Sequence, residues 1–152
     1  TTSSAEGTSK KIDNKFFMQT DKISISTGEF TAMDDDGDSN HRKTLVSPPG
    51  AGLLIVPFCA VIFVTYNGSV DTSNKTLNIG YDNVSTANTF QLSRFYSGAT
   101  SDRTYILNNN GSSFYDYAGF ATNKGLYAYA SGNFNGDFSA DLYISYRIID
   151  IS

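Results

Sequence analysis

The sequence predicts an all-β domain, an antiparallel β-sandwich of the jelly-roll type with about eight strands. Short apolar or alternating segments recur with turn residues between them, and helical patterning is confined to a turn or two at most. Tyr and Phe number 10 and 11 among 152 residues, and only 17% are charged. A chain of this length can bury one sizeable core. We therefore expect a flexible N-terminal arm over residues 1–15 and a single β-sandwich domain over residues 16–152.

The most apolar segment, residues 43–66, contains the strand around which the rest is organised. A short strand at Leu45 and Val46 ends in Pro-Pro-Gly-Ala-Gly, because proline removes amide donors and glycine permits a sharp reversal. Residues 53–64 carry no charge and are rich in β-branched and aromatic residues, which favours a strand. The segment is shorter than the roughly 18–20 residues of a membrane span, and it does not alternate. Both faces of the strand should therefore be covered, the second by another subunit.

The remaining strands are predicted from alternation and from the turn residues between them. We expect strands within residues 16–26, 76–81, 103–107, 126–131 and 140–149, a strand or short helix at 89–96, and a helical turn within 27–33. Ile23 and Ile25 share one face of the first of these strands. Asn67-Gly68 after the central strand is a strong hairpin signal. The last strand alternates most clearly, with four residues on its inward face, namely Leu142, Ile144, Tyr146 and Ile148.

Residues 34–41 form a hydrophilic, acidic loop that invites comparison with calcium sites. An EF-hand register with its glycine at Gly37 places Ala32 and Lys43 at the first and last positions, where carboxylates are required. An EF-hand is therefore excluded. A looser surface calcium site at residues 34–38 remains as the alternative to a solvated acidic loop.

Composition and motifs argue against several classes of function. The net charge is −4 and the sequence pI is about 4.7, which argues against nucleic acid or an anionic membrane as the main partner. Residues 1–15 lack the apolar stretch of a signal peptide. Cys59, the only cysteine, is expected to be a small buried hydrophobe. His41, the only histidine, lies in no catalytic or metal-binding motif, so we expect no enzyme activity and no cofactor.

Two groups of residues are candidates for interaction. Lys10, Lys11 and Lys15 in the arm can meet acidic groups on a neighbouring subunit. Residues 114–120 are aromatic and polar, so Tyr115, Tyr117 and Phe120 could stack on sugars. The alternative is that these aromatic side chains pack onto the sandwich or across a subunit contact.

Leu45-Val46, the following Ser-Pro-Pro-Gly-Ala-Gly and the apolar strand after it resemble the opening of small β-sandwich structural proteins of tailed bacteriophages. Such proteins often end on a strand similar to Tyr146-Arg147-Ile148. The resemblance spans residues 23–149, and the acidic loop at residues 34–38 and the polar arm depart from the pattern. The resemblance implies a virion protein. It favours a capsid decoration (cement) protein over a tail or fibre component. Such decoration proteins often form trimers.

The expected function is therefore that of a decoration protein on the outer capsid surface of a virion. It bridges neighbouring subunits of the major capsid protein, self-associates as a homotrimer, and binds neither nucleic acid nor membrane. The alternative is a tail or fibre component that binds a host receptor or glycan. Because the central strand is expected in the core, Ile55→Asp and Val61→Asp are each predicted to prevent folding.

Overall fold

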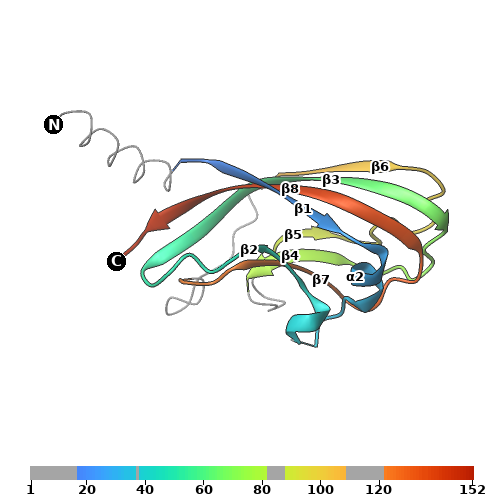
Figure 1. Ribbon diagram of the computed structural model, residues 1–152, viewed down its shortest axis with the longest axis horizontal. Helices are drawn as coiled ribbons and strands as arrows, with labels where there is room; N and C mark the ends of the chain where they lie inside the picture. The colour runs from blue at the N-terminus through green and yellow to red at the C-terminus, as the bar shows by residue number, and fades with distance from the viewer. Residues whose placement is uncertain (1–16, 37, 82–87, 109–121) are drawn as a thin grey trace.

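The computed structural model describes residues 17–36, 38–81, 88–108 and 122–152, and within them the protein is an all-β sandwich (Figure 1). The strands are β1 (Gln19–Ile25), β2 (Lys43–Val46), β3 (Leu53–Ser69), β4 (Leu77–Tyr81), β5 (Asn88–Leu92), β6 (Arg103–Asn108), β7 (Leu126–Ala130) and β8 (Asp137–Asp150). One short helix, α2 (Thr27–Ala32), and one 3-10 turn, η1 (Ser39–His41), lie between β1 and β2. The predicted fold class is confirmed.

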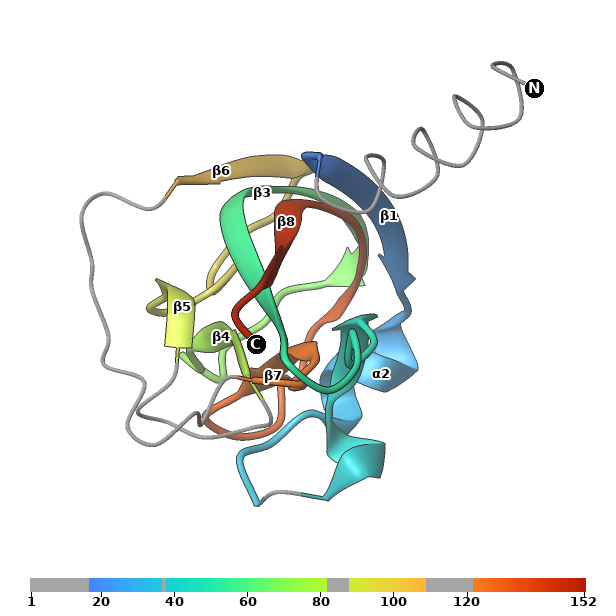
Figure 2. The ribbon, with the colours of Figure 1, turned by 90° about the vertical axis from the view of Figure 1, so that its left-hand side faces the viewer.

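The strands form two four-stranded antiparallel sheets that lie one over the other (Figures 1 and 2). Sheet A has the order β1-β8-β3-β6, and sheet B has the order β2-β7-β4-β5. The first strand therefore pairs with the last, the second with the seventh, the third with the sixth and the fourth with the fifth. This is a long hairpin rolled into two layers, which is the jelly-roll topology.

A cluster of four phenylalanine side chains forms part of the core between the sheets. Phe30, Phe95, Phe134 and Phe138 are each at most 2% exposed. The ring of Phe30 lies 4.7 Å from that of Phe138 and 5.7 Å from that of Phe134, centroid to centroid. Burying a Phe side chain stabilises a fold by about 1.5–3 kcal/mol, and tilted or edge-on ring pairs add to that. Packing of these four rings therefore stabilises the sandwich together with the aliphatic core residues of both sheets, such as Ile62 and Ile79.

Helix α2 brings Phe30 into this cluster because the sequence encodes a strong helix start. The Ser26 hydroxyl accepts a hydrogen bond from the Glu29 backbone N–H, and the Glu29 carboxylate accepts one from the Ser26 N–H at 2.8 Å. This reciprocal arrangement is a capping box, which satisfies two orphan donors at the helix start. The predicted helical turn within residues 27–33 is confirmed.

The hairpin predicted at Asn67-Gly68 is wrong. Strand β3 runs on to Ser69 and still pairs with Asp137 of β8, after a register shift between Tyr66 and Ser69. Gly68 has φ +129°, which glycine adopts readily. The Asn-Gly pair therefore lies at a register shift within the strand. Glycine suits a bulge of this kind as well as it suits a turn.

The ambiguous segment 89–96 is a strand only as far as Leu92. Arg94 and Tyr96 have φ values of 51° and 56°, which a right-handed helix does not allow. These turns point Phe95 and Tyr96 into the core, where each is at most 1% exposed. The helical alternative for this segment is therefore wrong.

Candidate functional site

The outer face of sheet A is the first candidate, because its central strand is apolar on both sides. On the inner side of β3, Ile62 is fully buried and Val64 is 2% exposed. The intervening Val61 and Phe63 point outward, since successive side chains of a strand alternate between faces. Phe63 is 48% exposed, and its ring packs edge-on against Tyr143 at 5.8 Å.

A β-bulge adds a further aromatic side chain to this face. The register of β3 on β8 shifts between Pro57 and Cys59, so Phe58 is the extra residue. Bulges accommodate a proline and re-aim side chains, and here Phe58 is 36% exposed. Cys59 shares the outward side with Val61 and is half-buried. The expectation that Cys59 is a small buried hydrophobe is therefore wrong for the single chain, because the alternation after the bulge turns it outward.

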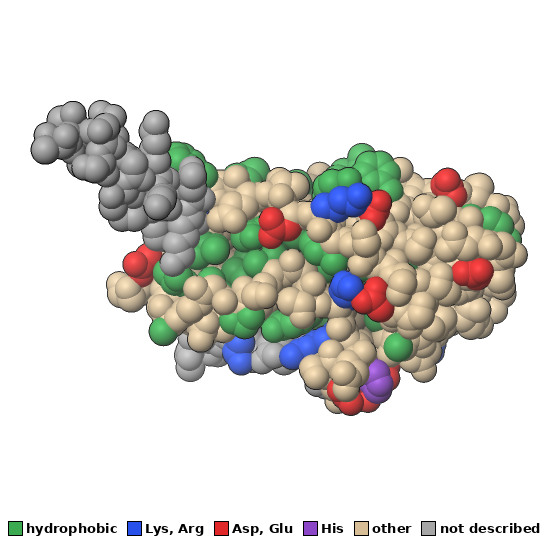
Figure 3. Space-filling model, in the orientation of Figure 1, with side chains coloured by type: hydrophobic (Ala, Val, Ile, Leu, Met, Phe, Trp, Pro, Cys, Tyr) green, Lys and Arg blue, Asp and Glu red, His purple; other side chains and the backbone are tan. Residues whose placement is uncertain are grey.

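Together these outward side chains form a continuous apolar band that we call the β3 stripe: Val56, Phe58, Cys59, Val61 and Phe63 of β3, with Ile106 of β6. Val61 lies opposite Ile106 on one side and opposite Tyr143 on the other. Ile106 is 74% exposed. Figure 3 shows hydrophobic side chains projecting at the top of the molecule, where β3 and β6 run in Figure 1. An exposed apolar band on a sheet face is a candidate interaction site.

The other half of the same face, on β1 and β8, is polar and charged. The Asp141 carboxylate accepts a hydrogen bond from the Ser24 hydroxyl at 2.7 Å and pairs with the Lys22 ammonium at 3.3 Å. The Ser24 hydroxyl, together with Lys22, holds the pKa of Asp141 below its ordinary value. The Lys22 nitrogen also lies 5.9 Å from the centre of the Tyr143 ring. The face therefore has an apolar half and a charged half, side by side.

A shallow groove of about 260 Å³ lies at the end of this charged half, beside the start of α2. Its lining combines hydroxyl groups with two carboxylates, from Ser24, Ser26, Glu29, Thr65, Ser139 and Asp141 among others. Hydroxyls and carboxylates give such a groove the hydrogen-bonding groups that a polar ligand requires.

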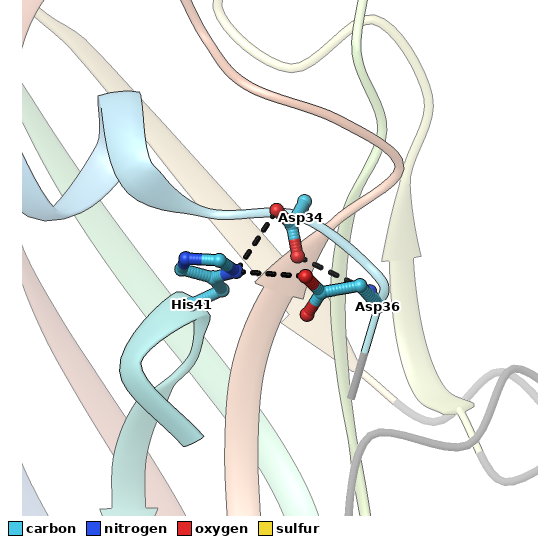
Figure 4. Close-up of side chains that lie close together, drawn as sticks. All are labelled: Asp34, Asp36 and His41. Atoms are coloured by element: carbon cyan, nitrogen blue, oxygen red, sulfur yellow. Dashed lines mark hydrogen bonds and ion pairs between the residues drawn. The ribbon is translucent and has the colours of Figure 1, made fainter. Parts of the chain in front are cut away.

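The acidic loop between α2 and η1 is the second candidate (Figure 4). The Nδ1 atom of His41 lies 3.0 Å from Oδ2 of Asp34 and 3.0 Å from Oδ2 of Asp36. Asp34 and Asp36 in turn accept hydrogen bonds from backbone N–H groups two residues further on, at Asp36 and Asp38. The loop is thus organised by its own carboxylates, with the imidazole between two of them.

The electrostatics of this cluster favour a charged imidazole. The hydrogen bond with Asp36 raises the pKa of His41, and the nearby charges of Asp34 and Asp36 act in the same direction. The backbone N–H of Asp38 lowers the pKa of Asp36, and the Asp34 and His41 side chains contribute further. The three side chains could together offer ligand atoms to a metal ion, since these atoms lie within 4.8 Å of one another. Calcium prefers oxygen ligands throughout, so the imidazole nitrogen does not suit calcium. The 3.0 Å contacts of His41 with Asp34 and Asp36 are those of an ion-pair cluster.

Asp71 is a buried carboxylate with a structural role. It is fully buried, and it accepts hydrogen bonds from the Ser73 hydroxyl and from the backbone N–H groups of Asn135, at 2.8 Å, and Gly136, at 3.2 Å. A Cβ at Gly136 would lie 2.6 Å from the Asp71 nitrogen. A buried carboxylate with this many donors is compensated, so Asp71 locks two loops together at one end of the sandwich.

The residues predicted as interaction sites all lie outside the described residues: Lys10, Lys11, Lys15, Tyr115, Tyr117 and Phe120. The β3 stripe was recognised as part of the central strand, but its members were not predicted as a site. The signal that pointed to them was the missing alternation, because a one-sided strand would place polar residues at positions 59, 61 and 63.

Comparisons with known proteins give little further information. No protein-family model and no curated protein sequence matches the chain. Among solved structures, the chain is similar to one described as "Israeli acute paralysis virus heated to 63 degree - full particle", with 12% identity, over 93% of this chain and 74% of that one, at a TM-score of 0.28. So low a score carries no argument, and the fold assignment rests on strand order alone. In the part of the chain that the structure describes, no helix is long and apolar enough to cross a membrane.

Proposed function

We propose that this chain is a structural protein of a viral particle. More narrowly, it is a decoration (cement) protein of the tailed-bacteriophage type that bridges neighbouring major capsid protein subunits on the outside of the shell. The role is non-catalytic. Jelly rolls are found in viral capsid and lectin domains and in cupins, but a fold does not determine a function, so the proposal needs a surface that fits it.

The observation that carries the proposal is the β3 stripe. Phe63 is 48% exposed and Ile106 is 74% exposed on a regular sheet face. A protein that acts alone gains nothing from such a face, whereas an assembly protein buries it against coat subunits or copies of itself. A sandwich whose side chains are already ordered loses little entropy on binding.

Charge supports the outer surface rather than the interior of the shell. The net charge is −4, so packaged nucleic acid would repel this protein. The basic residues Lys10, Lys11 and Lys15 lie within the first 15 residues, which span at most about 50 Å when extended. This segment would lie along a neighbouring coat subunit and pair with its acidic groups.

The proposal is tested on purified particles of the virus that encodes the chain. Gold-labelled antibodies against the protein should bind shells and not tails. Protein lacking residues 1–15 should fold, as judged by circular dichroism, but bind stripped shells more weakly than the full chain. Label found only on tails would refute the decoration role, and equally tight binding by the truncated protein would refute the role of the arm.

The groove beside Asp141 favours a second candidate, a tail or fibre component that binds a host receptor or glycan. Its hydroxyl and carboxylate lining suits the hydroxyls of a neutral sugar, and the Phe63 and Tyr143 rings on the same face provide apolar surface for a sugar ring. A glycan array with the full chain separates the two candidates. Asp141→Asn should abolish any specific glycan signal that depends on this groove, while Asp35→Asn on the distant loop should leave it unchanged.

A further inference from the structure

On the outer face of sheet A, the apolar residues of β3 lie directly opposite the polar residues of β8. The order of these pairs along the strands makes the face complementary to a second copy of itself. Four outward-facing rungs of paired residues follow one another along β8 and β3: Asp141 opposite Phe63, Tyr143 opposite Val61, Ser145 opposite Cys59, and Arg147 opposite Val56. The bulge at Phe58 keeps the fourth rung in phase with the others. The acidic Asp141 therefore lies at one end of the series along β8, and the basic Arg147 lies at the other end.

We propose that two copies of this chain pack through this face, β3 on β3, about a two-fold axis. The axis lies in the interface, runs across the strands and passes between the Val61 rung and the Cys59 rung. This inference deepens the self-association expected of an assembly protein, but it does not depend on a viral shell.

The direction of the axis follows from packing apolar side chains on apolar side chains. A two-fold axis along the strands would place β3 and β6 of one copy on β8 and β1 of the other, and so would stack apolar side chains on charged ones. An axis across the strands places each strand on its own counterpart, as an isologous interface requires. The β3 stripes then pack against each other, and Val61 of one copy lies opposite Cys59 of the other.

Charge complementarity fixes the position of the axis along the strands. With the axis in this position, the rung of Val61 and Tyr143 in one copy faces the rung of Cys59 and Ser145 in the other. The rungs of Asp141 and Arg147 each lie one step further from the axis, so they also face each other. Asp141 of each copy then meets Arg147 of the other, and Phe63 meets Val56. The contact occurs twice by symmetry. Lys22 already pairs with Asp141 at 3.3 Å, and the second cation completes the compensation of a carboxylate that loses water on pairing.

The size of the face is also appropriate. Strands β3 and β8 have 17 and 14 residues and are flanked by β1 and β6, with 7 and 6. With strands about 4.8 Å apart and about 3.3 Å per residue, the face covers about 700 Å². A standard interface buries about 800 Å² on each partner. Aligned sheets stack about 10 Å apart with their side chains interdigitating, so the face is close to what a small dimer needs.

The first test uses the chain's only cysteine, Cys59, which lies on the rung next to the proposed axis. A bismaleimide whose spacer spans about 10 Å, the distance between stacked sheets, should join two full-length chains in high yield. The control is the double substitution Cys59→Ser and Asp35→Cys, which moves the thiol to the exposed loop and should leave the product monomeric. Equal cross-linking of both proteins would overturn the proposal.

The second test reverses the charges. Light scattering and sedimentation should find a dimer for the full chain at micromolar concentration. Asp141→Arg alone and Arg147→Asp alone should each weaken dimerisation by roughly tenfold or more, because like charges then meet at two places. The two substitutions together should restore it.

The outcomes of the charge reversal distinguish this proposal from its rivals. A double variant no tighter than the single ones would show that these residues do not meet, and the axis would be wrong. A trimer, as expected from sequence, requires a head-to-tail contact and would also overturn the two-fold packing. A stable monomer would overturn self-association altogether, yet leave binding of that monomer to coat subunits intact. Circular dichroism on each variant shows whether a loss of dimer reflects loss of the fold.

Discussion

The two faces of strand β3 have nearly the same composition but different surroundings. On the inner face, Ala60 and Ile62 are fully buried beneath sheet B. On the outer face, Val61 and Phe63 are as apolar, but Phe63 remains 48% exposed in the single chain. The inner face is covered by the chain's own second layer, while the outer face needs another molecule. An apolar sequence therefore predicts that a surface is covered. Only the fold shows whether the chain itself covers that surface or leaves it to another molecule.

The largest effect on folding should separate two neighbouring residues of β3, Ile62 on the inner face and Val61 on the outer face. Ile62→Asp buries an unpaired carboxylate in the core, which costs several kcal/mol, of the same order as the roughly 5–15 kcal/mol that hold a typical domain folded. We expect this variant to be unfolded by circular dichroism. Val61→Asp places the same carboxylate on the outer face, so the chain should fold but fail to self-associate.

This expectation corrects the prediction that Val61→Asp prevents folding, while the one for Ile55→Asp stands, because Ile55 is fully buried. Urea titration of Ile62→Asp and Val61→Asp, each with light scattering at the same concentration, measures both effects. If Val61→Asp were as unfolded as Ile62→Asp, the assignment of the two faces would be incorrect.

A smaller contrast should separate two phenylalanines. Phe138 is fully buried and its ring lies 4.8 Å from that of Tyr96 and 4.7 Å from that of Phe30. Phe138→Ala should lower the free energy of unfolding by about 3–5 kcal/mol. Phe63→Ala should lower that of the monomer by about 1 kcal/mol or less, because the side chain is already in contact with water. Chemical denaturation below the concentration of association measures both values, and equal losses would mean that Phe63 is part of the core.

The order and type of the strands were predictable because the apolar periodicity is unambiguous in most of them. Strand β8 alternates along its length, and its inward side chains, Leu142 and Ile144, are fully buried as expected. The topology was predictable only as a class, since strand pairing joins residues more than a hundred positions apart, such as Gln19 and Tyr146. No local pattern specifies such a pair.

The outer-face site and two features of the fold were less predictable, for three physical reasons. A bulge changes the phase of alternation by one residue, so the outward position of Cys59 could not be read from its neighbours. The Asn67-Gly68 pair fits both a hairpin and an irregular strand, and pairing with β8 decides between them. The buried Asp71 receives its donors from Asn135 and Gly136, which are distant in sequence. In each case a long-range contact overrides a local preference.

The smallest effect should arise in the acidic loop, which belongs to neither face of β3. The fold raises the pKa of His41 above its ordinary value of 6.5, chiefly through the hydrogen bond with Asp36. A raised pKa means that the folded state favours the protonated imidazole. Its stabilising contribution is therefore fully present below about pH 6.5 and is lost as the pH rises through the raised value. The His41 side chain is 34% exposed, so solvent screens the ion pair and the change should be slight.

The melting temperature of the natural protein should exceed that of His41→Gln at about pH 5.5, and the difference should vanish by about pH 9. Subtracting the two curves removes the titration of all other groups, because these are common to both proteins. Since His41 is the only histidine in the chain, its ring protons are resolved in a proton NMR titration, which gives the pKa directly. Asp35→Asn, whose side chain lies outside the cluster, should leave that pKa nearly unchanged, whereas Asp36→Asn should lower it. A measured pKa at or below 6.5 in the natural protein would contradict the ion-pair geometry of Figure 4.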